Sequence, residues 1–238
     1  MCRYMAIVAA SSLVMLFAGC QNPPGYPNPA PLRPSDAMDF ASLYGQNCAG
    51  CHGASGKNGP ATDLANPEYQ ALVDDATLHK VIANGMPGTL MPAFGDSAGG
   101  TLTDGQVGAL VAGMRKQWQK PNAFEGATPP PYTQAKPGDA KRGEQEYEAH
   151  CAICHRSSTQ EITGRAYLPL VGDQALRTFI IVGRPDTGHP DWRHSSRDGK
   201  PATPLSSQEV DDIVTYLSTL RNPAAVSQQA GKAANPGR

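Results

Sequence analysis

The sequence predicts two tandem helical halves separated by a proline-rich break. The segment Cys-Ala-Gly-Cys-His at 48–52 returns as Cys-Ala-Ile-Cys-His at 151–155, an offset of 103 residues. Near its end, each half carries apolar residues at the i, i+3, i+4, i+7 spacing of a helix with one buried face. Residues 121–136, with three successive prolines at their centre, form the break.

The start of the chain has the pattern of an export signal. Arg3 precedes an apolar run at 5–17, which is shorter than a bilayer span, and small residues lead to Cys20. This resembles a bacterial lipoprotein signal over residues 1–19, in which Cys20 would become the lipidated first residue. An uncleaved anchor and an ordinary signal peptide are the alternatives, and all of them export the chain. We expect a lipid-anchored protein on the periplasmic face of a bacterial membrane.

Proline content sets the remaining boundaries. Residues 20–37 are rich in proline, which favours an extended chain, so they form a tether. We then expect the first domain at 38–120, the linker at 121–136, the second domain at 137–222 and a polar tail at 223–238.

Each half should begin and end with a helix. Tyr44 and Tyr147 each stand four residues before the first cysteine of their motif, and the preceding residues predict helices over 36–47 and 139–150. Pairs of capping residues start the last helix of each half, and apolar stripes follow them as core. These pairs are Thr103 with Gln106 and Ser206 with Glu209; the stripes are Val107, Leu110, Val111, Met114 and Val210, Ile213, Val214, Leu217.

The repeated pentapeptide predicts covalent haem. Two thiols three residues apart add across the vinyl groups of a haem, and the adjoining histidine is the proximal iron ligand. A four-ligand zinc site would bring its two cysteine pairs closer in sequence, and a thioredoxin-like pair needs no following histidine. We therefore expect two haem c groups, bound through Cys48, Cys51 and His52 and through Cys151, Cys154 and His155.

The two halves also match in the segment between the cysteine motif and the last helix, where equivalent residues are 98 positions apart. In this register Gly85 pairs with Gly183, and the prolines that follow them pair as well. Met91 then falls opposite His189.

The order of N-terminal helix, haem motif, short helix, Met-Pro loop and capped C-terminal helix resembles a class I cytochrome c domain, in both halves. The resemblance implies an all-α fold that wraps a haem and leaves its edge exposed. It also implies His52 and His155 as proximal ligands and Met91 as the distal ligand of the first haem. Met86 is the alternative to Met91, but it aligns with Arg184.

The second half departs from that family at the distal ligand. His189 stands where the family usually has methionine, and no methionine follows Met114. His189 could itself bind the iron and give a bis-histidine centre. The alternatives are His194 and an iron that is open or water-bound.

The expected function is electron transfer. A net charge of -1 argues against nucleic acid as a partner. Two haems whose axial sites are both filled by protein pass electrons but leave no vacancy for substrate, so we assign no catalytic residue. The expected donor and acceptor are a quinol-oxidising complex and a terminal oxidase, with electrons entering at the second haem. The alternative is a di-haem enzyme, peroxidase-like or oxidising sulfur compounds, with a labile distal ligand on the second haem.

Overall fold

The computed structural model describes residues 32–134, 136–156, 162–164, 167–194 and 203–221. The chain divides into two compact units, Met1–Asp36 and Ala37–Arg238, and both halves of the repeat lie in the second unit. The predicted signal peptide, Cys20 and the predicted tail lie outside the described residues.

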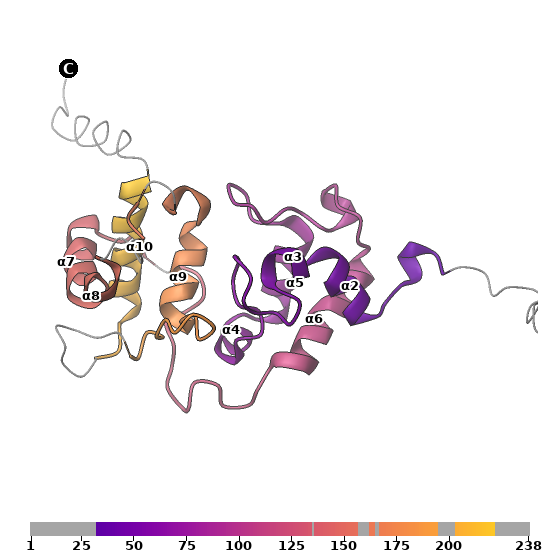
Figure 1. Ribbon diagram of the computed structural model, residues 1–238, viewed down its shortest axis with the longest axis horizontal. Helices are drawn as coiled ribbons and strands as arrows, with labels where there is room; N and C mark the ends of the chain where they lie inside the picture. The colour runs from indigo at the N-terminus through magenta and orange to yellow at the C-terminus, as the bar shows by residue number, and fades with distance from the viewer. Residues whose placement is uncertain (1–31, 135, 157–161, 165–166, 195–202, 222–238) are drawn as a thin grey trace, which may run out of the picture. The chain divides into compact units, whose positions relative to one another are not determined.

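The described part of the chain is helical and forms no β-strand, which confirms the all-α prediction (Figure 1). A 3-10 turn, η1 (Pro34–Asp36), is the only helical element described in the first unit. The first half contains α2 (Phe40–Asn47), α3 (Ala49–His52), α4 (Pro67–Leu72), α5 (Asp75–Asn84), η2 (Asp96–Ala98) and α6 (Asp104–Trp118). The second half contains α7 (Ala140–His150), α8 (Ala152–His155), η3 (Leu168–Leu170), α9 (Asp173–Val182) and α10 (Ser207–Arg221).

Capping side chains explain where the helices begin. Both predicted capping boxes are confirmed: the backbone N–H of Thr103 donates to Gln106 Oε1 at 3.0 Å, and that of Ser206 donates to Glu209 Oε2 at 2.7 Å. The predicted start of the first helix was wrong. Asp39 caps α2 by accepting from the backbone N–H of Ser42 at 2.8 Å, so the helix begins at Phe40 and not at 36.

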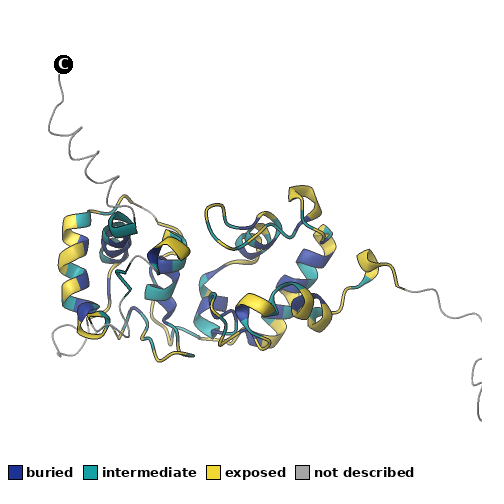
Figure 2. Ribbon diagram, turned by 45° about the horizontal axis from the view of Figure 1, so that its top comes forward, coloured by how far each residue is buried: buried dark blue, intermediate teal, exposed yellow. Residues whose placement is uncertain are grey.

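The core of each half is the apolar stripe predicted for its last helix. All eight stripe residues are buried, including Met114, so this methionine packs inside the first half. Figure 2 shows buried and exposed residues on opposite sides of the helices. The first and last helices of each half, α2 with α6 and α7 with α10, pack against each other across this core.

An arginine on the last helix of each half binds the segment at the start of the short helix. Arg115 on α6 and Arg221 on α10 each pair with the aspartate that begins the short helix, at 2.7 Å in both cases. Each guanidinium also donates to two backbone carbonyls just before that helix. The carbonyls belong to Gln70 and Val73 in the first half and to Leu168 and Val171 in the second, and the aspartates are Asp75 and Asp173. The residues that the two arginines contact are 98 positions apart, as the sequence register predicts.

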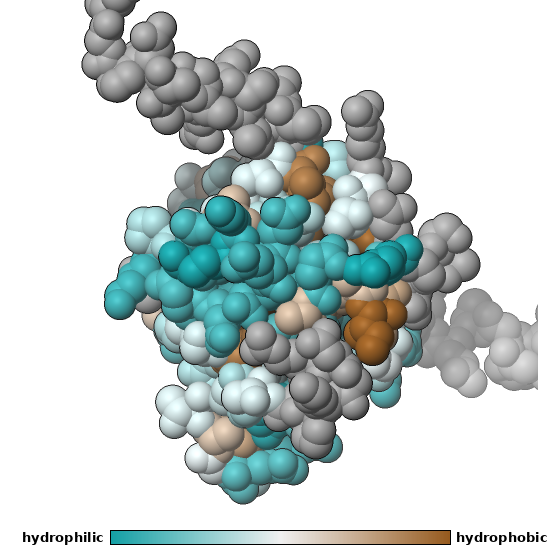
Figure 3. Space-filling model, turned by 90° about the vertical axis from the view of Figure 1, so that its left-hand side faces the viewer, coloured by the Kyte–Doolittle hydropathy of each residue, from teal (hydrophilic) through white to brown (hydrophobic). Residues whose placement is uncertain are grey.

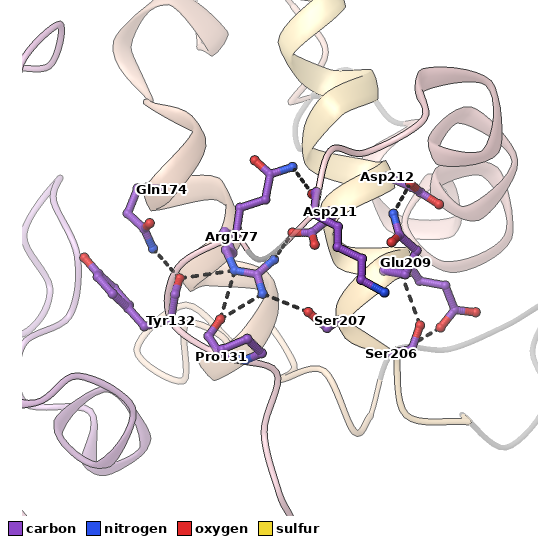
Figure 4. Close-up of polar contacts among 12 residues, drawn as sticks. Pro131, Tyr132, Gln174, Arg177, Ser206, Ser207, Glu209, Asp211 and Asp212 are labelled. Carbon is purple, nitrogen blue, oxygen red and sulfur yellow. Dashed lines mark hydrogen bonds and ion pairs between the residues drawn. The ribbon is translucent and has the colours of Figure 1, made fainter.

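The end of the linker belongs to the second half, because a buried arginine holds it there (Figure 4). Arg177 on α9 is 2% exposed and forms an ion pair with Asp211 on α10, which is buried as well. Its Nη2 donates to the carbonyl of Pro131 at 2.8 Å, and its Nε donates to the carbonyl of Tyr132 at 3.1 Å. Gln174 donates to the Tyr132 carbonyl too, at 2.7 Å. Residues 131–132 are therefore anchored to the second half.

Candidate haem-binding sites

Both cysteine motifs fold into the same short helical turn. Cys48 ends α2, where its N–H donates to the carbonyl of Tyr44 at 2.8 Å, and the N–H of His52 donates to the carbonyl of Cys48 at 3.0 Å. The second motif repeats these two bonds at 2.8 and 3.0 Å. Residues at i, i+3 and i+4 share one face of a helix, so each turn presents two thiols and an imidazole on the same side.

The thiols have the properties of neutral groups. Burial raises the pKa of Cys48 to about 11 and that of Cys151 to about 12, so neither is a thiolate at neutral pH. The described residues also contain no cluster of three or more histidine, cysteine or acidic side chains arranged to hold a metal ion.

The geometry of His52 suits an iron ligand. Its Nδ1 lies 2.8 Å from the carbonyl oxygen of Thr62, and a carbonyl only accepts hydrogen bonds, so Nδ1 carries the proton. That tautomer leaves the Nε2 lone pair for a metal, with the ring orientation fixed by the second bond. Burial lowers the pKa of His52, which favours the neutral imidazole that binds metals.

The second site brings the rings of two histidines close together. The ring centroids of His155 and His189 lie 5.8 Å apart with 35° between their planes. A metal bound to one nitrogen of each ring at about 2 Å would place the centroids roughly 6 Å apart. Among the described residues, Nδ1 of His189 is a buried atom without a hydrogen-bond partner. Burial lowers the pKa of His189, so this ring too is neutral. The pair fits an iron between its rings.

The two distal loops share one backbone geometry. The N–H at position 86 donates to the carbonyl of Met91, and that of Arg184 donates to the carbonyl of His189, both at 3.0 Å. Gly85 and Gly183 have φ of +67° and +65°, and in either loop an added Cβ would lie 2.7 Å from the same distal carbonyl. Only glycine tolerates that position. Met91 and His189 therefore occupy equivalent places, as the sequence register predicts.

Exposed apolar side chains lie in the first distal loop and inside the second cysteine motif. Leu90 is 78% exposed beside Met91, and Ile153 is 60% exposed between the two cysteines of the second motif. On the side of the molecule drawn in Figure 3, hydrophobic residues form small separate patches on a mostly hydrophilic surface. Apolar surface beside the cysteines suits the porphyrin that two thioethers would hold there.

The alternative ligand of the second site lies elsewhere. His194 is 67% exposed in its side chain, and its Nδ1 lies 3.0 Å from Asp191 Oδ1. The imidazole is thus engaged by a carboxylate at the surface. Met86, the alternative in the first half, is half-buried like Met91.

Sequence patterns gave no signal for one group of residues between the sites. Asp186 pairs with Arg184 in the second distal loop, and Glu68 on α4 pairs with Arg193. Burial raises the pKa of Glu68 to about 7. Charged residues at irregular spacing in a loop carry no periodicity, so only the folded chain reveals that they meet.

Comparisons with known proteins assign each half separately. Residues 35–112 match the family model described as cytochrome c oxidase, cbb3-type, subunit III, and residues 140–221 match the cytochrome c family. A cbb3-type cytochrome c oxidase subunit CcoP from Azospirillum sp. (strain B510) is 27% identical over 144 residues, which is 54% of this chain and 44% of that protein. The chain thus covers less than half of that relative. No solved structure matches the chain significantly.

Proposed function

We propose that this di-haem c-type cytochrome, with its two tandem cytochrome c domains and two covalent haem c groups, carries electrons from a quinol-oxidising complex to a terminal oxidase. Electron transfer is what c-type haems supply when both axial positions are held by protein. The observation that carries the proposal is the facing pair of His155 and His189, with centroids 5.8 Å apart. Such a pair would supply two imidazole ligands to one iron.

We assign the haem contacts residue by residue. Cys48 and Cys51 form the thioethers of the first haem, and its iron ligands are His52 and Met91. Cys151 and Cys154 attach the second haem, with His155 and His189 as its ligands. A methionine sulfur raises the potential of a haem iron. The second haem is therefore the low-potential entry and the first haem the exit.

The terminal oxidase is proposed from the relative's name. The CcoP protein of Azospirillum is named as a subunit of a cbb3-type oxidase, and the first half matches the subunit III model of that oxidase type. This chain would serve such an oxidase either as a separate carrier or as its electron-entry subunit. In both cases its acceptor has a higher potential than the first haem.

We further propose that the protein is exported and held to a membrane by lipid on Cys20. The support is the signal-like pattern before Cys20. No helix among the described residues is both long and apolar enough to cross a membrane. Replacing Cys20 by serine should release haem-loaded protein from the membrane fraction. Retention of the C20S variant, with no lipid on the native Cys20, would identify an uncleaved anchor instead.

Reconstitution tests the carrier function. Membranes that contain a quinol-oxidising complex and a terminal oxidase, but lack their own c-type cytochromes, should regain quinol-dependent oxygen uptake when the holoprotein is added. A variant with all four motif cysteines replaced by alanine carries no haem and serves as the control. Turnover of hydrogen peroxide without any restoration of oxygen uptake would contradict the proposal and favour a peroxidase.

A further inference from the structure

The distal loop of the second half packs against the first half through polar contacts along its whole length. Its start, its middle and its end each reach a different part of the first half. The contacts are Asn66 Nδ2 to the Val182 carbonyl at 2.9 Å, the Asn58 N–H to Asp186 Oδ2 at 3.2 Å, Arg184 Nη2 to the Gly59 carbonyl at 3.3 Å, and the ion pair of Arg193 with Glu68.

The middle contact is a rigid ion pair. Arg184 donates twice to Asp186, from Nε to Oδ1 at 2.9 Å and from Nη2 to Oδ2 at 2.8 Å. The side chains are 15% and 1% exposed, and the guanidinium also lies over the ring of Phe179 at 5.4 Å. A planar fork on a carboxylate has one geometry, so Asp186 fixes the direction in which Arg184 points.

The pair docks onto the loop that orients the first proximal histidine. Gly59 belongs to the stretch that runs from His52 to Thr62, and the carbonyl of Thr62 sets the ring of His52. This stretch is tightly packed, because a Cβ on Gly59 would lie 2.2 Å from the carbonyl oxygen of Cys51. Asp63, buried beside the same stretch, adds a second carboxylate near Arg184.

We propose that Arg184, held by Asp186, is a positioning residue that docks the distal loop of the second haem onto the proximal loop of the first haem. The halves then exchange electrons within one docked chain. The inference rests on the two-haem electron-transfer function, and it does not depend on which proteins donate or accept.

Two variants of the haem-loaded full chain test the docking contact. Arg184→Lys keeps the cation but cannot bind Asp186 and Gly59 as a planar fork, so it loosens docking while the charge remains. Arg184→Gln removes both. Lys141→Gln, at an exposed position on α7, is the matched control for loss of one cation.

The measurements need neither donor nor acceptor. Small-angle X-ray scattering reports docking, and interhaem exchange is followed after photoreduction, where one electron moves from ferrous to ferric iron without a proton or a broken bond. Losing one charge-assisted hydrogen bond should lower the ratio of docked to undocked molecules about tenfold. Both Arg184 variants should therefore expand the particle and slow exchange, whereas Lys141→Gln should leave both unchanged.

The outcomes distinguish the possible roles. Unchanged scattering and exchange in both variants would overturn the docking role. If R184Q fails to load haem, R184K alone still tests docking. These results stand whether or not the chain restores oxygen uptake, so failure of the proposed function is seen separately.

Discussion

Phe40 packs on Gly113 where the first and last helices of the first half cross. At the equivalent crossing in the second half, the glycine is on the first helix and the aromatic residue is on the last helix. A Cβ on Gly113 would lie 2.1 Å from the ring of Phe40. The offset of 103 relates Phe40 to Gly143 and Gly113 to Tyr216, and a Cβ on Gly143 would lie 2.9 Å from Tyr216 Cβ. Each crossing thus pairs one large aromatic residue with one glycine.

Alanine at these glycines should destabilise the protein. An added Cβ on Gly143 would lie 1.9 Å from the carbonyl oxygen of Asp212, which is backbone and cannot turn away. We expect Gly143→Ala to cost about 1–3 kcal/mol by overpacking. Gly113→Ala should cost less, because the Phe40 ring can move. Gly108, with nothing within 4 Å, is the control: alanine there should gain about 0.5–1 kcal/mol.

Guanidinium unfolding of the haem-loaded chains, followed in the Soret region, measures these differences. A G143A variant as stable as G108A would show that α7 and α10 do not cross at this distance.

The buried Arg177 should be worth several kcal/mol to the second half. Replacing it with methionine leaves Asp211 buried without its cation and frees the Pro131 carbonyl, which should cost about 3–5 kcal/mol. The double variant with leucine at Asp211 removes the unpaired charge and should recover much of that loss. Arg156→Met, which breaks an exposed pair with Glu148, should cost about 1 kcal/mol or less.

Denaturant unfolding compares the three variants. If the single and double variants of the Arg177 pair lose the same stability, the charge of Asp211 is not what the arginine offsets.

Part of this architecture was readable from the sequence, and part was not. The haem motifs and both capping boxes depend on the spacing of residues close in sequence, and the offset of 98 depends on the match between the two halves. The structure has the capping boxes and equivalent loops at that offset. The burial of Arg177 was invisible, because arginine usually lies at the surface and its partner Asp211 is thirty-four residues away. The docking by Arg184 was equally hidden, since it depends on two halves meeting. Which ligands hold the irons stays a prediction.

Changes at His189 should alter only the second haem. A methionine there should raise the lower of two midpoint potentials, because a thioether favours the ferrous iron more than an imidazole does. His189→Ala should open the site, so that carbon monoxide binds the reduced second haem. Redox titration with near-infrared and EPR spectra follows each haem separately. His194→Ala is the control, since that imidazole contacts Asp191. Carbon monoxide binding by the unaltered protein would instead indicate a vacant position.

Loss of one cysteine should weaken one attachment and leave the other half intact. Cys51→Ala removes a thioether from the first haem, and Cys154→Ala removes one from the second. Mass spectrometry after denaturation should find two haems on the unaltered chain, and the pyridine haemochrome band should shift for only one of the two in either variant. A chain that carries a single haem before any substitution would contradict the assignment.

Glu68 should make stability fall as the pH rises. Burial, with Asp191 nearby, raises the pKa of Glu68 to about 7 from its usual 4.5, although Arg193 opposes this. The folded chain therefore binds a proton that the unfolded chain has released, and stability is lost between pH 4.5 and 7. Glu68→Gln should flatten the pH dependence of the unfolding midpoint in that window. An identical slope in the two proteins would place the titration elsewhere.

The anchoring of Pro131 by Arg177 also limits how far the two halves can separate. Helix α6 ends at Trp118, so residues 119–130 alone span the gap, with a root-mean-square reach of roughly 20 Å if they were flexible. Each half then meets the other at an effective concentration of about millimolar. A surface too weak to join two separate proteins is therefore sufficient to hold the two halves of one chain together.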